Sequence, residues 1–364
     1  MARKTNKDED DAELPADTEG SALTGGRTLP LAEALELRAG AKKAVRTFFE
    51  ERDFLEVDTP HWVAAPGTDV HLDPVRAVYE DFAEQPSEDI TGYLHTSPEF
   101  AMKRLLVEGL ERIWQMCKVW RNGEIGPQHN PEFTLIEWYR AREPVDAIIE
   151  DVEALVGKLL GERGERPFER MTMRRLVDRA CGFDLMDALD FDGLLEAAKA
   201  HSLLPERSLK RAAINRRWDE LFFELQVTHL DPYLADRGAV FVTDWPANLA
   251  VLARRKPDEP RLAERFELYV DGVELANGFG ELTDPVEQRE RFAADNITRR
   301  ARGLPELPMP ERFLAALERG MPPSSGVAVG LDRILMLAAD VADIREVAPF
   351  AMRRDADSGE VLWG

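Results

Sequence analysis

The chain has 364 residues, of which 44% are hydrophobic and 32% are charged, and its formal net charge is −22. This composition is typical of a globular protein and excludes a disordered chain, which would be poorer in apolar residues. The acidic balance disfavours broad binding to nucleic acids, because such binding depends on neutralising phosphates with basic side chains.

The sequence also restricts the compartment. No apolar run approaches the roughly 20 residues that a membrane span requires, and residues 1–20 contain no apolar core of a secretory signal. Cys117 and Cys181 are the only cysteines, which excludes a disulfide scaffold and a cysteine-rich zinc site. We therefore expect a cytoplasmic protein without a membrane partner.

Residues 1–30 are rich in Asp, Glu, Gly and Thr and almost free of large apolar side chains, which predicts a disordered acidic tail. No repeat or long linker follows, so residues 31–364 are expected to form one domain. This domain begins with a helix over 31–51, where apolar residues recur at helical spacing. The next predicted elements are short strands at 54–57, 113–120 and 133–139.

Mainly helical segments over 144–160 and 172–227 lead to a second group of strands. A strand at 240–242 is followed by one at 266–270, in which apolar residues alternate with polar ones. Asp271-Gly272 is a strong signal for a hairpin turn, so the returning strand is placed at 273–279.

A well-marked helix follows this hairpin. Asp284 is placed to cap it, Pro285 suits its first position and Glu287 completes a capping box. Gly303, followed by Pro305, ends it. Strands from both ends of the chain come together without a regular βαβ rhythm, which predicts an α+β domain with a mainly antiparallel sheet. The sequence has no Walker loop and no G-x-G-x-x-G, so a nucleotide must be held in another way.

Three segments carry unusual groupings of residues. The first is Phe54–Pro60 (FLEVDTP), the second joins Trp120–Glu124 (WRNGE) to His129–Tyr139 (HNPEFTLIEWY), and the third is Gly326–Arg333 (GVAVGLDR). In this order they resemble the three sequence motifs of the class II aminoacyl-tRNA synthetases. The resemblance implies the catalytic core of that family, with a mainly antiparallel sheet flanked by helices, and ATP-dependent activation of an amino acid as its adenylate.

Further segments narrow the resemblance. Leu94–Glu99, Glu274–Phe279 and Glu281–Asp284 are similar to the lysyl-tRNA synthetase branch. Within it, the chain is most similar to the short paralogues that join lysine or (R)-β-lysine to a lysine side chain of elongation factor P. A lysyl-tRNA synthetase would carry an N-terminal OB-fold that reads the anticodon. Only the acidic tail precedes the core here, so we expect elongation factor P and not tRNA as the acceptor. A truncated lysyl-tRNA synthetase, an adenylate-forming ligase with another acceptor and a catalytically silent relative stay open as alternatives.

The resemblance implies that Arg121 and Arg333 are the catalytic arginines, which bind ATP at its α-phosphate and γ-phosphate sides. Activation brings a carboxylate onto an anionic phosphate, so fixed positive charge is needed there. Phe133 would stack on adenine. The other residues that the resemblance assigns to ATP are Glu124, His129, Asn130, Glu274, Leu275 and Gly330.

Glu274 and Glu281 would also hold Mg²⁺, whose preferred ligands are oxygens. On a straight strand their odd offset of seven residues would place them on opposite faces. A bend or bulge near Gly278 is therefore expected to bring them together.

The resemblance assigns the amino-acid substrate to Ser97, Glu99, Tyr139, Glu281 and Ala328. A lysine-like ammonium in a partly buried pocket needs a carboxylate partner, because an unpaired charge is costly there. Glu99 or Glu281 would supply that carboxylate. The sequence leaves open whether the donor is α-lysine or (R)-β-lysine.

The chain departs from the family pattern at two positions. The second motif usually reads Arg-x-Glu, but here Gly123 stands at the third position and the acid follows at Glu124. Either Glu124 takes over the contact on the adenine side or that contact is lost. Lysyl-tRNA synthetases have Gly where this chain has Ala328, whereas the paralogues that modify elongation factor P have Ala. The resemblance also implies a homodimer, because the segment ending at Pro60 forms the dimer interface in this family.

Overall fold

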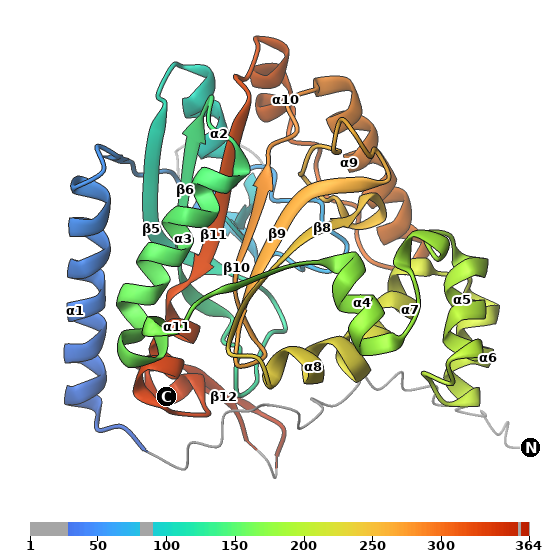
Figure 1. Cartoon of the computed structure of the whole chain (residues 1–364). Helices are drawn as coiled ribbons and strands as arrows, with labels where there is room; N and C mark the ends of the chain where they lie inside the picture. Colours follow the sequence, from blue (N-terminus) through green and yellow to red (C-terminus); the bar gives the residue numbers. More distant parts are fainter. Residues whose placement is uncertain (1–27, 81–89, 356–357, 364) are drawn as a thin grey trace, which may run out of the picture.

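An eight-stranded sheet organises the chain, and its strands come from distant parts of the sequence (Figure 1). In chain order they are β1 (Leu55–Glu56), β5 (Arg112–Trp120), β6 (Glu132–Ala141), β7 (Glu169–Thr172), β8 (Ala239–Pro246), β9 (Leu262–Val270), β10 (Val273–Gly280) and β11 (Ser324–Gly330). Across the sheet they lie in the order β1-β5-β6-β11-β10-β9-β8-β7. Neighbours from β5 to β8 are antiparallel, and only the edge strands β1 and β7 run parallel to their neighbours. The predicted α+β fold with a mainly antiparallel sheet is confirmed.

The computed structural model describes residues 28–80, 90–355 and 358–363. The predicted tail over 1–30 therefore lies almost wholly outside the described residues, and the prediction of one domain over 31–364 stays a prediction. None of the described helices is both long enough and apolar enough to cross a membrane.

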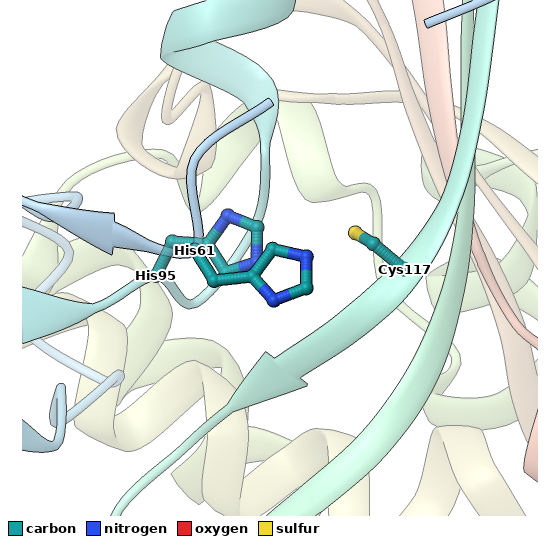
Figure 2. A group of neighbouring side chains, drawn as sticks. All are labelled: His61, His95 and Cys117. Carbon is teal, nitrogen blue, oxygen red and sulfur yellow. The ribbon is translucent and has the colours of Figure 1, made fainter. Parts of the chain in front are cut away.

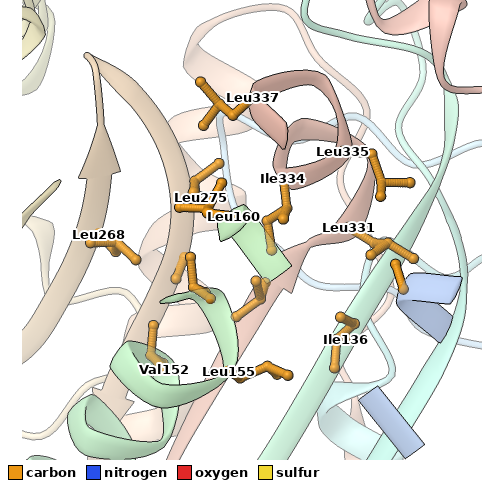
Figure 3. Packing of buried hydrophobic residues seen from close by; sticks show 14 of the residues in the cluster. Ile136, Val152, Leu155, Leu160, Leu268, Leu275, Leu331, Ile334, Leu335 and Leu337 are labelled. Carbon is orange, nitrogen blue, oxygen red and sulfur yellow. The ribbon is translucent and has the colours of Figure 1, made fainter. Parts of the chain in front are cut away.

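One face of the sheet is covered by α1 (Leu31–Glu50), α3 (Val145–Leu160) and α11 (Leu331–Ala339) (Figure 1). Successive side chains of a strand point to opposite faces, and on β6 it is Ile136 and Trp138 that enter this apolar core. Figure 3 shows leucines of α3 and α11 packed against Ile136, Leu268 and Leu275 of the sheet. This core fixes one face of the sheet, so the alternate residues of the same strands are free to build a site on the other.

The opposite face is bordered by two groups of helices. The first group packs around Ile113 and Tyr139, which are the alternates of Trp114 and Trp138; it comprises α2 (Glu99–Val107), α9 (Pro285–Ala301) and α10 (Glu311–Glu318). The second group has its own core against β7, β8 and β9. Its helices are α4 (Met173–Cys181), α5 (Phe191–Ala200), α6 (Glu206–Asn215), α7 (Trp218–Leu225) and α8 (Asp231–Ala235).

Shorter elements complete the described chain. A three-stranded sheet lies in the order β2-β4-β3, and β12 pairs with β13. These strands are β2 (Trp62–Val63), β3 (Arg76–Tyr79), β4 (Ile90–Leu94), β12 (Met352–Arg354) and β13 (Val361–Trp363). Single turns of 3₁₀ or π helix occur at Gly161–Glu165, Leu185–Asp187, Gln226–Leu230, Ala247–Leu249 and Ile344–Glu346.

Each of the six predicted strands overlaps a strand of the large sheet, and the helix predicted over 31–51 is α1. The hairpin turn at Asp271-Gly272 is confirmed, because both residues have positive φ angles (49° and 78°) as a type I′ turn requires. The cap of α9 is also confirmed: the Asp284 carboxylate accepts hydrogen bonds from the backbone N–H groups of Val286 and Glu287. The second half of the predicted capping box is wrong, because the Glu287 carboxylate pairs with Arg291.

A buried polar contact joins α1 to the segments that carry the second and third motifs. The guanidinium of Arg38 on α1 pairs with Asp332 in the first turn of α11. The same Asp332 carboxylate accepts a hydrogen bond of 2.6 Å from the backbone N–H of Thr134 on β6. Arg38 also donates to the backbone carbonyl of Val347 at 2.7 Å. The long N-terminal helix therefore helps to set the position of Arg333, the residue after Asp332.

Candidate active site

Two adjoining pockets lie on the face of the sheet that is not covered by α1, α3 and α11. One is a cavity of about 170 Å³ and the other a cavity of about 350 Å³. Arg121, Arg265, Asn277 and Ala328 line both, so the two cavities meet along these side chains. A molecule with two chemically different ends could therefore occupy both pockets at once.

The strand register explains why these residues share one face. On β6 the alternation that buries Ile136 and Trp138 turns Phe133, Leu135, Glu137 and Tyr139 toward the pockets. The β11 residues that pair with Tyr139, Glu137 and Leu135 also face the pockets, and each of them is glycine or alanine. These pairs are Gly326 with Tyr139, Ala328 with Glu137 and Gly330 with Leu135.

All five residues assigned to the amino-acid substrate line the smaller cavity, which we call the donor pocket. They are Ser97, Glu99, Tyr139, Glu281 and Ala328. Gly326 makes this arrangement possible, because a Cβ atom there would lie 2.3 Å from the Tyr139 ring and 2.7 Å from Glu281 Oε1. The structure thus brings the five assigned residues together in one pocket, and their individual roles stay predictions.

Two acids of the donor pocket contact a buried lysine that the sequence did not single out. Lys103 on α2 is completely buried, and its Nζ atom lies 2.5 Å from Glu99 Oε1 and 2.5 Å from Glu281 Oε2. Burial opposes the charge, but Glu281 and Glu99 outweigh it and raise the pKa of Lys103. Both predicted carboxylate partners of a substrate ammonium therefore already share an internal ammonium.

Glu137 is a third acid of the donor pocket that the sequence analysis missed. Its Oε2 accepts a hydrogen bond of 2.7 Å from the Ser97 hydroxyl, and its Oε1 accepts one of 2.7 Å from the Tyr139 hydroxyl. Burial, reinforced by the nearby Glu99, raises the pKa of Glu137 to about 8. An available signal was the position of this acid in the middle of an otherwise apolar strand, two residues before Tyr139.

All nine residues assigned to ATP line the larger cavity, which we call the nucleotide pocket. They are Arg121, Glu124, His129, Asn130, Phe133, Glu274, Leu275, Gly330 and Arg333. Gly330 caps α11 with φ of −78°, and an added Cβ would meet no atom within 4 Å. Neither backbone conformation nor packing therefore requires a glycine here, which favours the predicted contact with a ligand.

The two predicted catalytic arginines both line the nucleotide pocket, but the protein holds them differently. The Arg121 guanidinium lies 5.0 Å from the centre of the Phe133 ring, and its buried Nε has no hydrogen-bond partner in the described part of the chain. Arg333 is held in place by hydrogen bonds of 2.8 Å to the Glu274 carbonyl and 2.7 Å to His129 Nε2. Arg333 is therefore held in place by the protein, whereas Arg121 keeps an N–H group that can donate a hydrogen bond to a ligand.

Arg265 is a further cation that the sequence analysis missed. It lines both pockets, donates to Glu267 Oε1 at 2.5 Å and, like Arg121, has a buried Nε without a partner among the described residues. A sequence signal existed, because Arg265, Glu267 and Tyr269 place polar groups on one face of β9. Two buried donors without partners at the junction of the cavities favour an anion there.

The structure refines the expectations for His129, Asn130 and Glu124. Burial and the nearby Arg333 and Arg121 lower the pKa of His129 to about 4, so a neutral imidazole accepts the hydrogen bond from Arg333 and supplies no charge for a phosphate. The Asn130 amide donates to the Glu132 carbonyl at 2.6 Å and accepts from the Met352 N–H at 2.8 Å. Gly123 has φ of +80°, a turn conformation that favours glycine, and the turn leaves Glu124 on the pocket wall.

The proposed Mg²⁺ ligands end on the same side of the sheet, but by another route than expected. The β-bulge lies between Glu274 and Ala276 and not near Gly278, where a Cβ would meet the Phe266 ring at 2.4 Å. The extra residue cancels the odd offset, so Glu274 and Glu281 both face the pockets. They nevertheless line different cavities, and Glu281 is paired with Lys103.

Comparisons with known proteins agree with this geometry. Residues 21–354 match the family described as tRNA synthetases class II (D, K and N). An elongation factor P–(R)-β-lysine ligase of Edwardsiella ictaluri is 40% identical over 327 residues, which are 89% of this chain and 96% of that protein. Proteins of the same name from Klebsiella pneumoniae and Haemophilus influenzae are 38% and 40% identical over 318 and 316 residues, or 94% of each relative.

Proposed function

Because this chain belongs to the class II tRNA synthetase family (D, K and N), and within it to the branch of the elongation factor P–(R)-β-lysine ligases, we propose that it lysylates elongation factor P. The chain is an ATP-dependent amino-acid ligase. In the proposed reaction it activates lysine or (R)-β-lysine as an aminoacyl-adenylate and transfers the acyl group to a lysine side chain of the factor.

The observation that carries this proposal is the junction of an acidic pocket with a nucleotide pocket. Glu99, Glu137 and Glu281 line the donor pocket and suit the ammonium end of a lysine-like donor. Arg121 and Arg265 lie where the two cavities meet, each with a buried donor to offer. The donor carboxylate and the α-phosphate would approach each other at this junction.

The chemistry then follows in two steps. A carboxylate oxygen of the donor forms a bond to the α-phosphorus, the bond to the bridging oxygen breaks and pyrophosphate leaves. Next, an unprotonated amine of the acceptor attacks the acyl carbon, the bond to AMP breaks and the amine proton passes to solvent. Arg121 would stabilise the charge of the first transition state, and Arg333, held by Glu274 and His129, would bind the departing phosphates.

Glu274 fits a Mg²⁺ ion better than Glu281 does. Its side chain is 41% exposed in the nucleotide pocket, and carboxylate oxygens together with substrate phosphates are the usual magnesium ligands. When bound, the ion would neutralise charge on the phosphates. Glu281 is buried, and one of its two carboxylate oxygens already contacts Lys103. We therefore propose Glu274 as the main protein ligand.

Ala328 supports a β-amino donor. It lines both cavities opposite Glu137, so its methyl group lies where the amine-bearing carbon and the carboxylate of the donor would meet. A methyl group there narrows the space beside an α-amino group, as expected for a pocket that prefers (R)-β-lysine. We expect this methyl group to contribute a discrimination of about 1–3 kcal/mol between the two lysine isomers.

The homodimer also belongs to this proposal. Leu31 and Leu35 of α1 and Leu55 of β1 are exposed, although they belong to or adjoin the segment that would form the interface. A second copy would cover these apolar side chains, and light scattering would detect its mass.

The decisive experiment measures the intact mass of elongation factor P after incubation with the enzyme, ATP and either lysine isomer. We expect a mass increase of one lysyl group, larger in yield with (R)-β-lysine, and none with the Arg121→Ala variant. A factor with Lys→Arg at its acceptor position should stay unmodified. If labelled donor accumulates on tRNA while the factor stays unmodified, the proposed acceptor is wrong and a lysyl-tRNA synthetase activity replaces it.

A further inference from the structure

Outside the two pockets, the fold brings His61, His95 and Cys117 together (Figure 2). Each offers one nitrogen or sulfur atom, and these three atoms lie within 4.8 Å of one another. The imidazole rings of His61 and His95 stack at 5.0 Å, and Figure 2 shows the sulfur of Cys117 on β5 pointing toward them. From this cluster we propose a zinc site with two imidazole ligands and one thiolate ligand.

His95 provides the sharpest evidence for a ligand. Its side chain is buried, and its Nε2 lies 2.8 Å from the backbone carbonyl of Lys118. A carbonyl can only accept, so Nε2 carries the hydrogen and Nδ1 keeps a free lone pair. That Nδ1 is buried and has no hydrogen-bond partner among the described residues. A histidine whose second nitrogen donates to a backbone carbonyl is the usual form of a metal-binding imidazole.

The set of ligand atoms selects the class of metal. Nitrogen and sulfur ligands exclude Mg²⁺ and Ca²⁺, which prefer oxygens, and suit zinc, which accepts both. Ligand atoms around a tetrahedral zinc ion are separated by roughly 3.6 Å, given bonds of about 2.0–2.3 Å. The cluster must therefore contract by about an ångström, and the exposed His61 side chain is free to move. A water molecule would take the fourth position, as in zinc sites with three protein ligands.

A cavity beside the cluster provides access for an ion. His61 and Cys117 line a cavity of about 250 Å³ together with Asp58, Lys42, Arg46 and Lys118. Two of these cations are already paired, since Arg46 lies 3.4 Å from Glu56 and Lys118 lies 3.2 Å from Glu132. Asp58 adds a negative charge to the lining of the same cavity. When zinc binds, a zinc–sulfur bond replaces the S–H bond of Cys117 and the proton passes to solvent.

The position of the cluster gives the ion a structural role beside the active site. His61 follows the first motif, His95 lies two residues before Ser97 of the donor pocket, and Cys117 lies four residues before Arg121. Backbone hydrogen bonds already connect these segments: the His95 N–H donates to the His61 carbonyl at 2.9 Å and the Trp120 N–H to the His95 carbonyl at 3.0 Å. A bound ion would cross-link three segments that position the catalytic residues.

The test is metal binding by the full-length chain. After treatment with a chelator and dialysis, the protein is titrated with Zn²⁺ against a chromophoric chelator and its zinc content is measured by mass spectrometry. We expect one zinc per chain. His61→Ala should weaken the affinity at least about tenfold and should fold normally, because the side chain it shortens is exposed. Zinc should also raise the thermal midpoint of the wild-type chain and not that of this variant.

Cobalt substitution identifies the sulfur ligand. We expect a thiolate-to-cobalt charge-transfer band in the wild-type chain, its loss in Cys117→Ser and its persistence in Cys181→Ser, a matched control at the other buried cysteine. The proposal is overturned if the chain binds no zinc in the titration, if His61→Ala binds zinc as tightly as the wild-type chain, or if the cobalt band survives Cys117→Ser. Binding of copper(I) without zinc would equally overturn the assignment to zinc.

Discussion

The ammonium of Lys103 lies, fully buried, between two carboxylates that a lysine-like donor would also seek. Removing one partner of a buried ion pair leaves an uncompensated charge, which is far more costly than the loss of an exposed pair. Glu99 and Glu281 both depend on this single cation, so Lys103 supports the whole acidic wall of the donor pocket. It acts on the substrate through these two carboxylates and is a positioning residue.

Lys103→Met keeps the length and apolar stem of the side chain but removes the ammonium. We expect the free energy of unfolding in urea to fall by about 3–5 kcal/mol and the KM for the donor in pyrophosphate exchange to rise. The matched control is Lys199→Met, because Lys199 is 47% exposed in its pair with Glu196 and should change stability by less than about 1 kcal/mol. Equal effects of the two substitutions would contradict the role of Lys103.

The sequence identifies residues whose role depends on neighbours in the chain, and it misses those whose role depends on tertiary packing. Arg121, Phe133 and Arg333 belong to short sequence motifs, so the residues next to them in the chain identify them. Lys103 looks like one more polar position of a helix four residues after Glu99, and its burial depends on α10 packing over it. Its role arises from tertiary packing, which no local pattern contains.

At the scale of elements, the bulge in β10 shows how local backbone geometry builds the site. If β10 were regular, with no bulge between Glu274 and Ala276, the alternation would turn Glu274 into the apolar core and the Leu275 side chain toward the nucleotide pocket. The alternation of the sequence predicts β10, and the odd offset between Glu274 and Glu281 predicts a bend or bulge between them. The sequence does not show where the bulge lies. Gly278 looks like the flexible point, yet its missing side chain only makes room for the Phe266 ring.

The contact between α1 and α11 yields a prediction at the same scale. Arg38→Met removes the cation from Asp332, which also holds the backbone of Thr134, and leaves that carboxylate buried and uncompensated. We expect a loss of about 3–5 kcal/mol in unfolding free energy. The KM for ATP should rise, because Arg333 follows Asp332 in α11. Urea unfolding and pyrophosphate exchange measure the two effects.

The control for this prediction lies on the same helix. Arg46 is 48% exposed and contacts Glu56 at 3.4 Å, so Arg46→Met should change stability by less than about 1 kcal/mol and leave the KM for ATP unaltered. The hypothesis that α1 positions the third motif fails if Arg38→Met destabilises the chain without any change in the KM for ATP.

At the scale of the whole molecule, a chain with a net charge of −22 also buries acids that resist ionisation. Burial, together with Glu99, raises the pKa of Glu137 to about 8, and burial raises that of Asp231 to about 7. In the unfolded chain such groups titrate near pH 4. Buried histidines act in the opposite sense, since burial lowers the pKa of His95 to about 4 and, with nearby arginines, that of His129 to about 4.

These shifts predict how stability depends on pH. Between about pH 4 and 6.5 the folded acids hold protons that the unfolded chain has lost, while the folded histidines lack protons that the unfolded chain holds, so the two effects oppose each other. Above pH 6.5 the histidines of the unfolded chain are less than half protonated, so their opposing effect fades. The acids then decide, and because the folded state binds more protons, the free energy of unfolding should fall as pH rises from 6.5 to 8. Each protonated acid contributes a slope of up to about 1.4 kcal/mol per pH unit.

Urea unfolding across this range measures the slope. Glu137→Gln should reduce it. Glu132→Gln should not, because the Glu132 side chain on the same strand is 44% exposed. A free energy of unfolding that stays constant or rises from pH 6.5 to 8 would show that these acids are ionised in the folded chain, and the donor pocket would then carry its full negative charge before any substrate binds.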